Sequence, residues 1–119
     1  MSTIREQVEE IIREEPVAVF IKGTPEVVMC GNSERALRAL WQAGAPISAV
    51  DVLGDPRIRE ELSAVSGWPT IPQVFVKGEL VGGADICEEL AASGELKQTI
   101  DATLGAEHEQ VVKTLVVAE

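Results

Sequence analysis

Cysteine and histidine are scarce in this 119-residue chain, which has two cysteines and one histidine. Two cysteines cannot form a disulfide framework, so we expect a protein of the reducing cytoplasm. The chain has no apolar stretch long enough to span a bilayer, and its N-terminus has no charged start followed by an apolar run. We therefore expect neither a membrane segment nor a signal peptide. The single histidine, His108, lies in a polar segment and is expected to be solvated.

Positive charge is also in short supply, because ten basic residues face twenty acidic ones and the net charge is −10. This balance argues against nucleic acid or an anionic membrane as a partner. An anionic ligand would have to be bound by local positive charge, since the overall field repels it. Apolar residues make up 45% of the chain and charged residues 25%, a balance typical of a soluble globular domain.

The stretch from Lys22 to Ser33 organises the chain. It separates an apolar run, Val17–Ile21, from an amphipathic run, Glu34–Ala43, and so predicts a strand, a loop and a helix. Cys30 lies at the helix start, where unpaired N–H groups and the helix dipole favour a thiolate. We expect it to be more reactive than an ordinary cysteine. A redox pair would need a second cysteine at the position of Ser33, so Cys30 must find its sulfur partner outside its own motif.

Further helices and strands follow from the hydrophobic pattern. A capping box at Thr3 and Glu6 opens a first helix, and Trp41 is assigned to the apolar stripe of the second. Later come a strand at 47–52, a helix between Asp55 and Gly67, a hairpin of 73–76 with 79–81, and two helices that end at 94 and 105. Asp85 is expected at the N-cap of the fourth helix, or just before it.

This order predicts a thioredoxin-like α/β fold, with a four-stranded mixed sheet flanked by about five helices. The strand–helix–strand unit crosses over right-handed and is parallel, whereas the hairpin is antiparallel. Residues 1–105 are expected to form the domain. Residues 106–119 form a C-terminal tail that is either frayed or packed on a neighbour.

Three blocks resemble the monothiol glutaredoxins of the single-domain bacterial type, from about Ser2 to Gly105. They are Lys22-Gly-Thr-Pro with Cys30-Gly-Asn-Ser, then Trp68-Pro-Thr-Ile-Pro-Gln, and Gly78-Glu-Leu-Val-Gly-Gly-Ala-Asp. The chain departs from the family at two positions. Asn32 replaces the aromatic residue that usually follows Cys-Gly, and Ala84 stands where many members have a second cysteine.

The resemblance implies that glutathione binds beside Cys30. It also implies that two such proteins and two glutathiones hold one [2Fe-2S] cluster, and hence a homodimer when the cluster is bound. The stoichiometry is chemically reasonable because the cluster takes four thiolates. Each protomer offers one from Cys30, and glutathione supplies the other two. Cys87, inside the fourth helix, is expected to be a small core residue and not a ligand.

Two cations are implied as ligands for the glycine carboxylate of glutathione. They are Lys22, just after the first strand, and Arg59, on the third helix. For both residues the alternative is an ordinary surface charge.

The backbone is expected to hold the rest of glutathione. The family pattern makes the Ile71–Pro72 bond cis, which leaves the backbone of Ile71 free to pair with the ligand like an added strand. Gly83, Ala84 and Asp85 form a helix start whose N–H groups suit the γ-glutamyl carboxylate, and the Asp85 carboxylate suits the ammonium. Gly83 as a plain turn residue and Asp85 as a plain cap remain open.

Three functions fit these residues. The first is an iron–sulfur carrier that transfers a glutathione-ligated cluster to apo-protein clients. The second is a glutathione-dependent thiol-disulfide oxidoreductase that removes glutathione from proteins through Cys30. The third is a scaffold that binds a partner such as a BolA-like protein and senses iron. Asn32 weakens the first, because a polar residue replaces an aromatic one beside the ligand cysteine. It does not clearly favour the second. The resemblance favours the first and third functions over the second, the first is the preferred interpretation, and enzymatic activity is left open.

Overall fold

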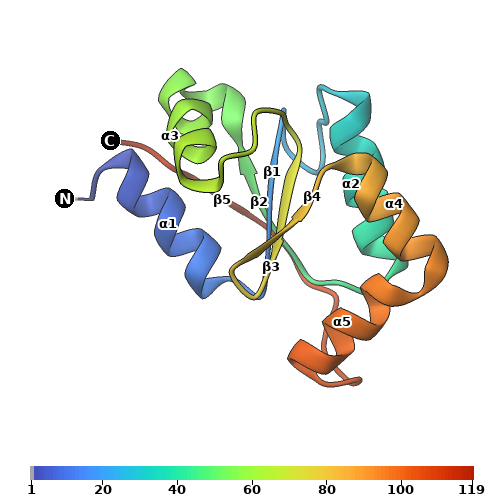
Figure 1. Cartoon of the computed structure of the whole chain (residues 1–119). Coiled ribbons are helices and arrows are strands. Elements are labelled where there is room, and N and C mark those ends of the chain that lie inside the picture. The colour runs from blue at the N-terminus through green and yellow to red at the C-terminus, as the bar shows by residue number, and fades with distance from the viewer. Residues whose placement is uncertain (1) are drawn as a thin grey trace.

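The structure is a computed structural model that describes residues 2–119. Helices and strands alternate through most of the chain (Figure 1). Among the helices of residues 2–119, none combines the length and the apolar character that a membrane crossing requires. In chain order the elements are α1 Ile4–Glu14, β1 Val17–Ile21, α2 Gly31–Gln42, β2 Ile47–Asp51, the short 3₁₀ helix η1 Val52–Gly54, α3 Pro56–Ser66, β3 Gln73–Val76, β4 Glu79–Gly82, α4 Ala84–Ser93, α5 Glu95–Leu104 and β5 Val112–Leu115.

The sheet has five strands in the order β4-β3-β1-β2-β5. β1 is parallel to β2, and β3 is antiparallel to β4, as the sequence predicts. β1 also pairs antiparallel with β3. The thioredoxin-like α/β fold is confirmed, but the predicted count of four strands is wrong. The fifth strand comes from the tail, and it pairs in parallel with the outer edge of β2.

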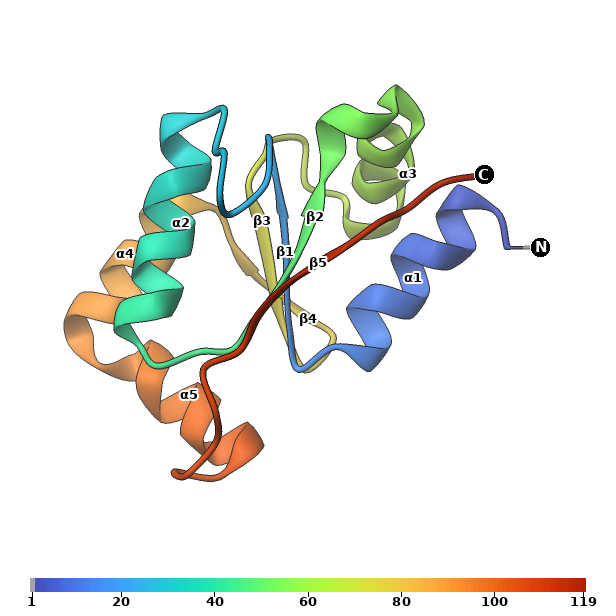
Figure 2. The ribbon, with the colours of Figure 1, turned by 180° about the vertical axis from the view of Figure 1, so that it is seen from behind.

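β5 runs along the edge of β2 (Figure 2). Side chains attach it to the rest of the molecule as well. Lys113 Nζ lies 2.8 Å from Glu15 Oε1, and that same oxygen accepts a 2.6 Å hydrogen bond from the Ser48 hydroxyl. Beyond the strand, Val117 is only 6% exposed and packs into the core. Edge pairing satisfies backbone groups that β2 would otherwise expose, so this segment completes the sheet.

β1 divides the interior into two cores because all five of its residues are buried and successive side chains point to opposite faces. Val17, Val19 and Ile21 pack with α2, α4 and α5 on one face. Ala18 and Phe20 pack with α1 and α3 on the other. The three-layer arrangement is visible in Figure 1, where α1 and α3 lie on one side of the sheet and α2 and α4 on the other.

Local signals in the sequence place most element ends correctly. The Thr3–Glu6 capping box is present at α1, and Asp55 caps α3 by accepting a hydrogen bond from the backbone N–H two residues on. The β3–β4 turn consists of Lys77 and Gly78, both with positive φ, as a tight hairpin turn requires. α4 begins earlier than predicted, because Gly83 occupies the N-cap position and Asp85 lies in the first turn.

Two predicted environments are wrong. Trp41 is 51% exposed, because the buried stripe of α2 runs through Ala36 and Leu40 and leaves the indole at its margin. His108 is not solvated, since only 11% of its side chain is exposed. Its ring nitrogens lie 2.9 Å from the carbonyl oxygen of Gly105 and 2.6 Å from that of Gly44, so the ring packs between the ends of α5 and α2.

Candidate functional site

The loop between β1 and α2 delivers Cys30 to the start of α2. It closes on itself through a hydrogen bond of 2.9 Å from the Met29 N–H to the Lys22 carbonyl. The loop is also tied to its surroundings, because the Gly23 N–H donates to the Asp51 carboxylate at 3.0 Å. Only glycine fits at position 23, where φ is +97° and a Cβ would lie 2.3 Å from a backbone oxygen. These contacts fix the position of Cys30.

Cys30 occupies the N-cap position of α2 and is partly buried. Its side chain makes no capping hydrogen bond. The backbone N–H of Ser33 is the main group that lowers the pKa of the Cys30 thiol, and the Ser33 hydroxyl, the Asn32 N–H and the charge of Lys22 act in the same direction. The expected bias toward thiolate is therefore present, and it arises from the helix start together with one nearby lysine.

The second cysteine is in the opposite environment. Cys87 is fully buried in the core between α2 and α4, and burial raises the pKa of its thiol to about 11. Both cysteines are free thiols. Cys87 therefore has the character of a small apolar core residue, as the sequence predicts.

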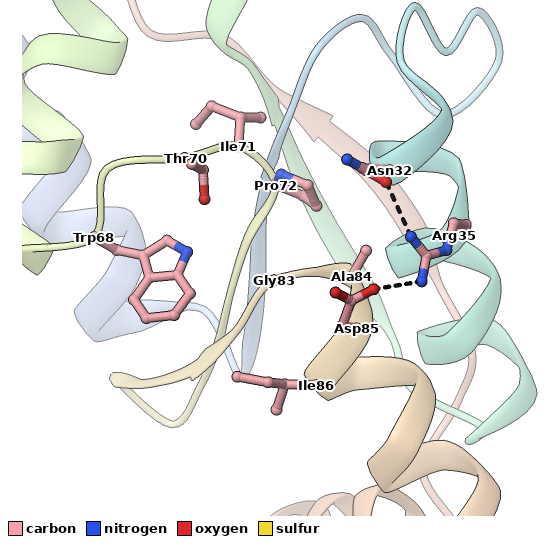
Figure 3. A pocket seen from close by; sticks show the side chains of 10 residues that line it. All are labelled: Asn32, Arg35, Trp68, Thr70, Ile71, Pro72, Gly83, Ala84, Asp85 and Ile86. Atoms are coloured by element: carbon pink, nitrogen blue, oxygen red, sulfur yellow. Dashed lines mark hydrogen bonds and ion pairs between the residues drawn. The ribbon is translucent and has the colours of Figure 1, made fainter.

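Four of the predicted site residues line one cavity of about 390 Å³: Ile71, Gly83, Ala84 and Asp85. We call it the cis-proline cavity, because Pro72 also lines it and the Ile71–Pro72 bond is cis, as expected (Figure 3). The loop that carries this bond is held in place by hydrogen bonds from the side chain of Gln73. The buried amide of Gln73 donates to the carbonyl oxygens of Trp68 at 2.9 Å and Thr70 at 3.2 Å.

The two predicted cations, Lys22 and Arg59, line a second cavity of about 490 Å³ together with residues of η1 and α3. Cys30 lines neither cavity. Its neighbour Asn32 lines the cis-proline cavity, and Lys22, whose charge reaches the thiol, lines the second. Cys30 therefore has a neighbour at each cavity: Asn32, two residues on in the chain, and Lys22, whose charge lowers the pKa of its thiol.

Two large apolar residues are exposed on the loop that leads to Cys30. The side chain of Val27 is 63% exposed and that of Met29 is 64% exposed, although both are large and hydrophobic. Both side chains remain exposed to solvent, although the backbone of their loop is fixed by the hydrogen bonds described above. Exposed apolar side chains grouped beside a reactive residue are typical of a contact surface.

Sequence reasoning missed Arg35. This residue projects from α2 toward α4 and lines the cis-proline cavity (Figure 3). Its guanidinium forms ion pairs with Asp85, at 2.6 Å, and with Glu88. It also donates to the side-chain oxygen of Asn32 at 3.0 Å. The spacing in the sequence was the available signal. Residues 32 and 35 are three apart on one helix, and residues 85 and 88 are three apart on another, so each pair lies on one helix face.

Comparison with known proteins identifies the family. The glutaredoxin family model matches residues 17–81. Glutaredoxin 4 of Escherichia coli is 45% identical over 103 residues, which cover 87% of this chain and 90% of that protein. The chain belongs to the glutaredoxin family. Its single-cysteine motif and its similarity to the monothiol glutaredoxins described next place it with the monothiol members.

Some relatives are longer. The chain spans 20% of rice monothiol glutaredoxin-S11, at 44% identity over 98 residues and 82% of this chain. It spans 50% of the mitochondrial rice monothiol glutaredoxin-S4, at 45% identity over 93 residues and 78% of this chain.

Solved structures agree on the fold. A monomeric truncated mutant of Trypanosoma brucei 1-C-Grx1 superposes with a TM-score of 0.77 at 39% identity, covering 86% of this chain and 93% of that one. A buckwheat glutaredoxin solved as a glutathione complex has a TM-score of 0.73, covering 84% of this chain and 89% of its own. At 23% identity it supports the fold alone.

Proposed function

We propose that this chain is an iron–sulfur carrier. It binds glutathione beside Cys30, holds a [2Fe-2S] cluster between two copies of itself, and passes the cluster to apo-proteins. The observation that carries the proposal is the state of Cys30: a single accessible thiol at a helix start, with a lowered pKa and no second cysteine beside it. A soft metal cluster takes thiolates, and this position favours one.

The count of donor groups supports sharing between two copies. The cluster takes four thiolates. Within residues 2–119, no group of three or more His, Cys, Asp and Glu side chains is placed to hold a metal. Cys87 is enclosed in the core and holds its proton up to high pH. One copy therefore offers only the thiolate of Cys30, so two copies need two thiolates from a small molecule.

The two cavities suit the two ends of glutathione. In this proposal Lys22 and Arg59 bind the glycine carboxylate in the second cavity, where both line the wall. The backbone of Ile71 pairs with the peptide backbone of glutathione. In this proposal the glutathione sulfur lies near Cys30, which has Asn32 of one cavity and Lys22 of the other as neighbours.

The γ-glutamyl end lies at the start of α4 in this proposal. The N–H groups of Ala84 and Asp85 are in the first turn, where they have no partner within the helix and can bind a carboxylate. Gly83 is the N-cap of α4 and also lines the cavity. The Asp85 carboxylate is 86% exposed, and in this proposal it binds the ligand ammonium while its Oδ1 also accepts from Arg35.

Val27 and Met29 give the second copy a surface to cover. Burial of these apolar side chains beside Cys30 would favour association and keep water from the sulfur ligands. The same surface suits a BolA-like partner in place of the second copy.

Anaerobic reconstitution with iron, sulfide and glutathione tests the proposal. We expect a coloured dimer with about two irons per dimer, measured by gel filtration, metal analysis and visible absorption. Without glutathione, or in Cys30→Ser, no coloured dimer should form. In the matched control Cys87→Ala it should form as in the unmodified protein. A monomer that retains iron without glutathione would rule the shared site out.

The lowered pKa of Cys30 also favours a second candidate function, reduction of protein–glutathione mixed disulfides. The Cys30 thiolate would attack the glutathione sulfur, breaking the S–S bond and releasing the client as a thiolate. A second glutathione thiolate would then release oxidised glutathione and restore Cys30. Turnover of a glutathionylated peptide with excess glutathione tests this activity separately from cluster binding.

A further inference from the structure

Arg35 lines the cis-proline cavity and is paired with two carboxylates: Asp85, which also lines the cavity, and Glu88, which lies outside its lining. Arg35 Nη2 donates to Asp85 Oδ1 at 2.6 Å, and Arg35 Nε donates to Glu88 Oε2 at 3.0 Å. The pairing joins α2 to the first turns of α4, so it crosses the side of the cavity at which α4 begins (Figure 3).

Asn32 and Glu88 hold the guanidinium in this place. The Asn32 amide oxygen accepts from Nη1 at 3.0 Å, while Nε and Nη2 both donate to the Glu88 carboxylate. Together with the bond to Asp85, these contacts engage every nitrogen of the guanidinium. A planar group with partners on three sides is restricted in orientation, so its charge stays at the cavity wall.

Arg35 lowers the negative charge beside the α4 start. Asp85 and Glu88 alone would contribute two negative charges beside the α4 start, and Arg35 reduces the sum to one. A carboxylate that approaches the N–H groups of α4 would be repelled by two neighbouring carboxylates. An ammonium group would be attracted by them. The guanidinium therefore changes which ligand group the α4 start can accept.

We propose that Arg35 determines the specificity of this site, because it neutralises part of the acidic wall and so allows the α4 start to accept a group that carries both an ammonium and a carboxylate. The inference rests on the proposed function, in which the γ-glutamyl end of glutathione is such a group. Arg35 acts through the local charge, and Asn32 is a positioning residue that holds it.

Three ligands make it possible to test the ammonium and the carboxylate of that group one at a time. S-methylglutathione carries both. S-methyl-glutaryl-cysteinylglycine lacks the ammonium, and S-methyl-4-aminobutanoyl-cysteinylglycine lacks the carboxylate. Isothermal titration at low ionic strength gives the affinity of each for the unmodified protein and for Arg35→Gln. We expect the carboxylate-only ligand to weaken most, on the order of fivefold, S-methylglutathione to weaken less, and the amine-only ligand not to weaken. Salt of about 0.5 M should shrink these differences.

Two further variants test the mechanism. In Arg35→Gln combined with Glu88→Gln, the wall again carries one negative charge, from Asp85. This double variant should recover the affinity for S-methylglutathione, and Arg35→Lys, which keeps the charge, should lose little. The matched control is Arg38→Gln, which removes the same charge one turn further along α2, where Arg38 pairs with Glu34 and does not line the cavity. It should leave the order of the three affinities unchanged.

The outcomes distinguish this inference from the proposed function. If the unmodified protein binds none of the three ligands, the glutathione site itself is wrong. If it binds them, but Arg35→Gln weakens all three equally or matches Arg38→Gln, Arg35 does not set specificity. Failure of the double variant to recover affinity would overturn the charge mechanism.

Discussion

Replacement of Val117 by alanine tests whether the C-terminal tail is part of the folded unit. Val117 is 6% exposed and packs with the α1–α3 core, whereas its neighbour Val116 is 84% exposed. The substitution removes two buried carbons, worth roughly 0.8 kcal/mol each. A residual cavity adds to this cost, and relaxation at the margin of the core reduces it. We expect a loss of about 1–2 kcal/mol in the free energy of unfolding.

Urea unfolding followed by far-ultraviolet circular dichroism measures this loss. At an m-value of about 1.5 kcal/mol/M, the midpoint of Val117→Ala should fall by about 1 M urea with an unchanged slope. Val116→Ala is the matched control, with the same chemical change one residue away, and it should unfold like the parent protein. Equal midpoints for both variants and the parent would refute the reasoning, because the tail would then be detached in solution.

The remaining predictions concern the site. Cys30→Ser should abolish thiol exchange and Cys87→Ser should not; loss of exchange in Cys87→Ser with intact circular dichroism would contradict this assignment. Alkylation of Cys30 by iodoacetamide should rise with pH around a midpoint below that of an ordinary cysteine, because its pKa is lowered, and should fall as acid protonates the thiolate. Arg59→Ala should weaken S-methylglutathione binding by up to about 1 kcal/mol at low salt and less at high salt, since Arg59 is exposed; calorimetry that shows no loss at either salt would remove it from the site. Asn32→Phe should slow the decay of cluster absorbance in air, because an apolar ring shields the sulfur ligands better than an amide; equal or faster decay would show that Asn32 is not the weak point.

Local and periodic signals in the sequence were sufficient for most of the fold. The buried run of β1, the capping box at Thr3 and the Lys77–Gly78 turn each depend on residues close in sequence. β5 could not be predicted in the same way. Its four residues are exposed or half-buried and show no clear alternation, and their pairing with β2 spans about sixty residues of chain. Only the finished sheet supplies the edge that makes this segment a strand.

The candidate site shows the same difference between features set by nearby residues and features set by contacts between distant ones. Position alone predicted the lowered pKa of Cys30 and the burial of Cys87. The ion pair between Arg35 and Asp85 could not be predicted, because it joins residues fifty positions apart on two helices. On either helix alone, these charges are typical of a solvated face. The approach of α2 to α4 in the folded protein turns them into one network.

The strand order also has a consequence for how the chain folds during synthesis. β2 is complete at residue 51, but its outer partner is β5, at residues 112–115. Until the ribosome has released those residues, the backbone groups along the outer edge of β2 have no native partner, and an unpaired edge is a template for association with other strands. The folding chain therefore carries an open edge on β2 until residues 112–115 are available, and β5 is the strand that covers it.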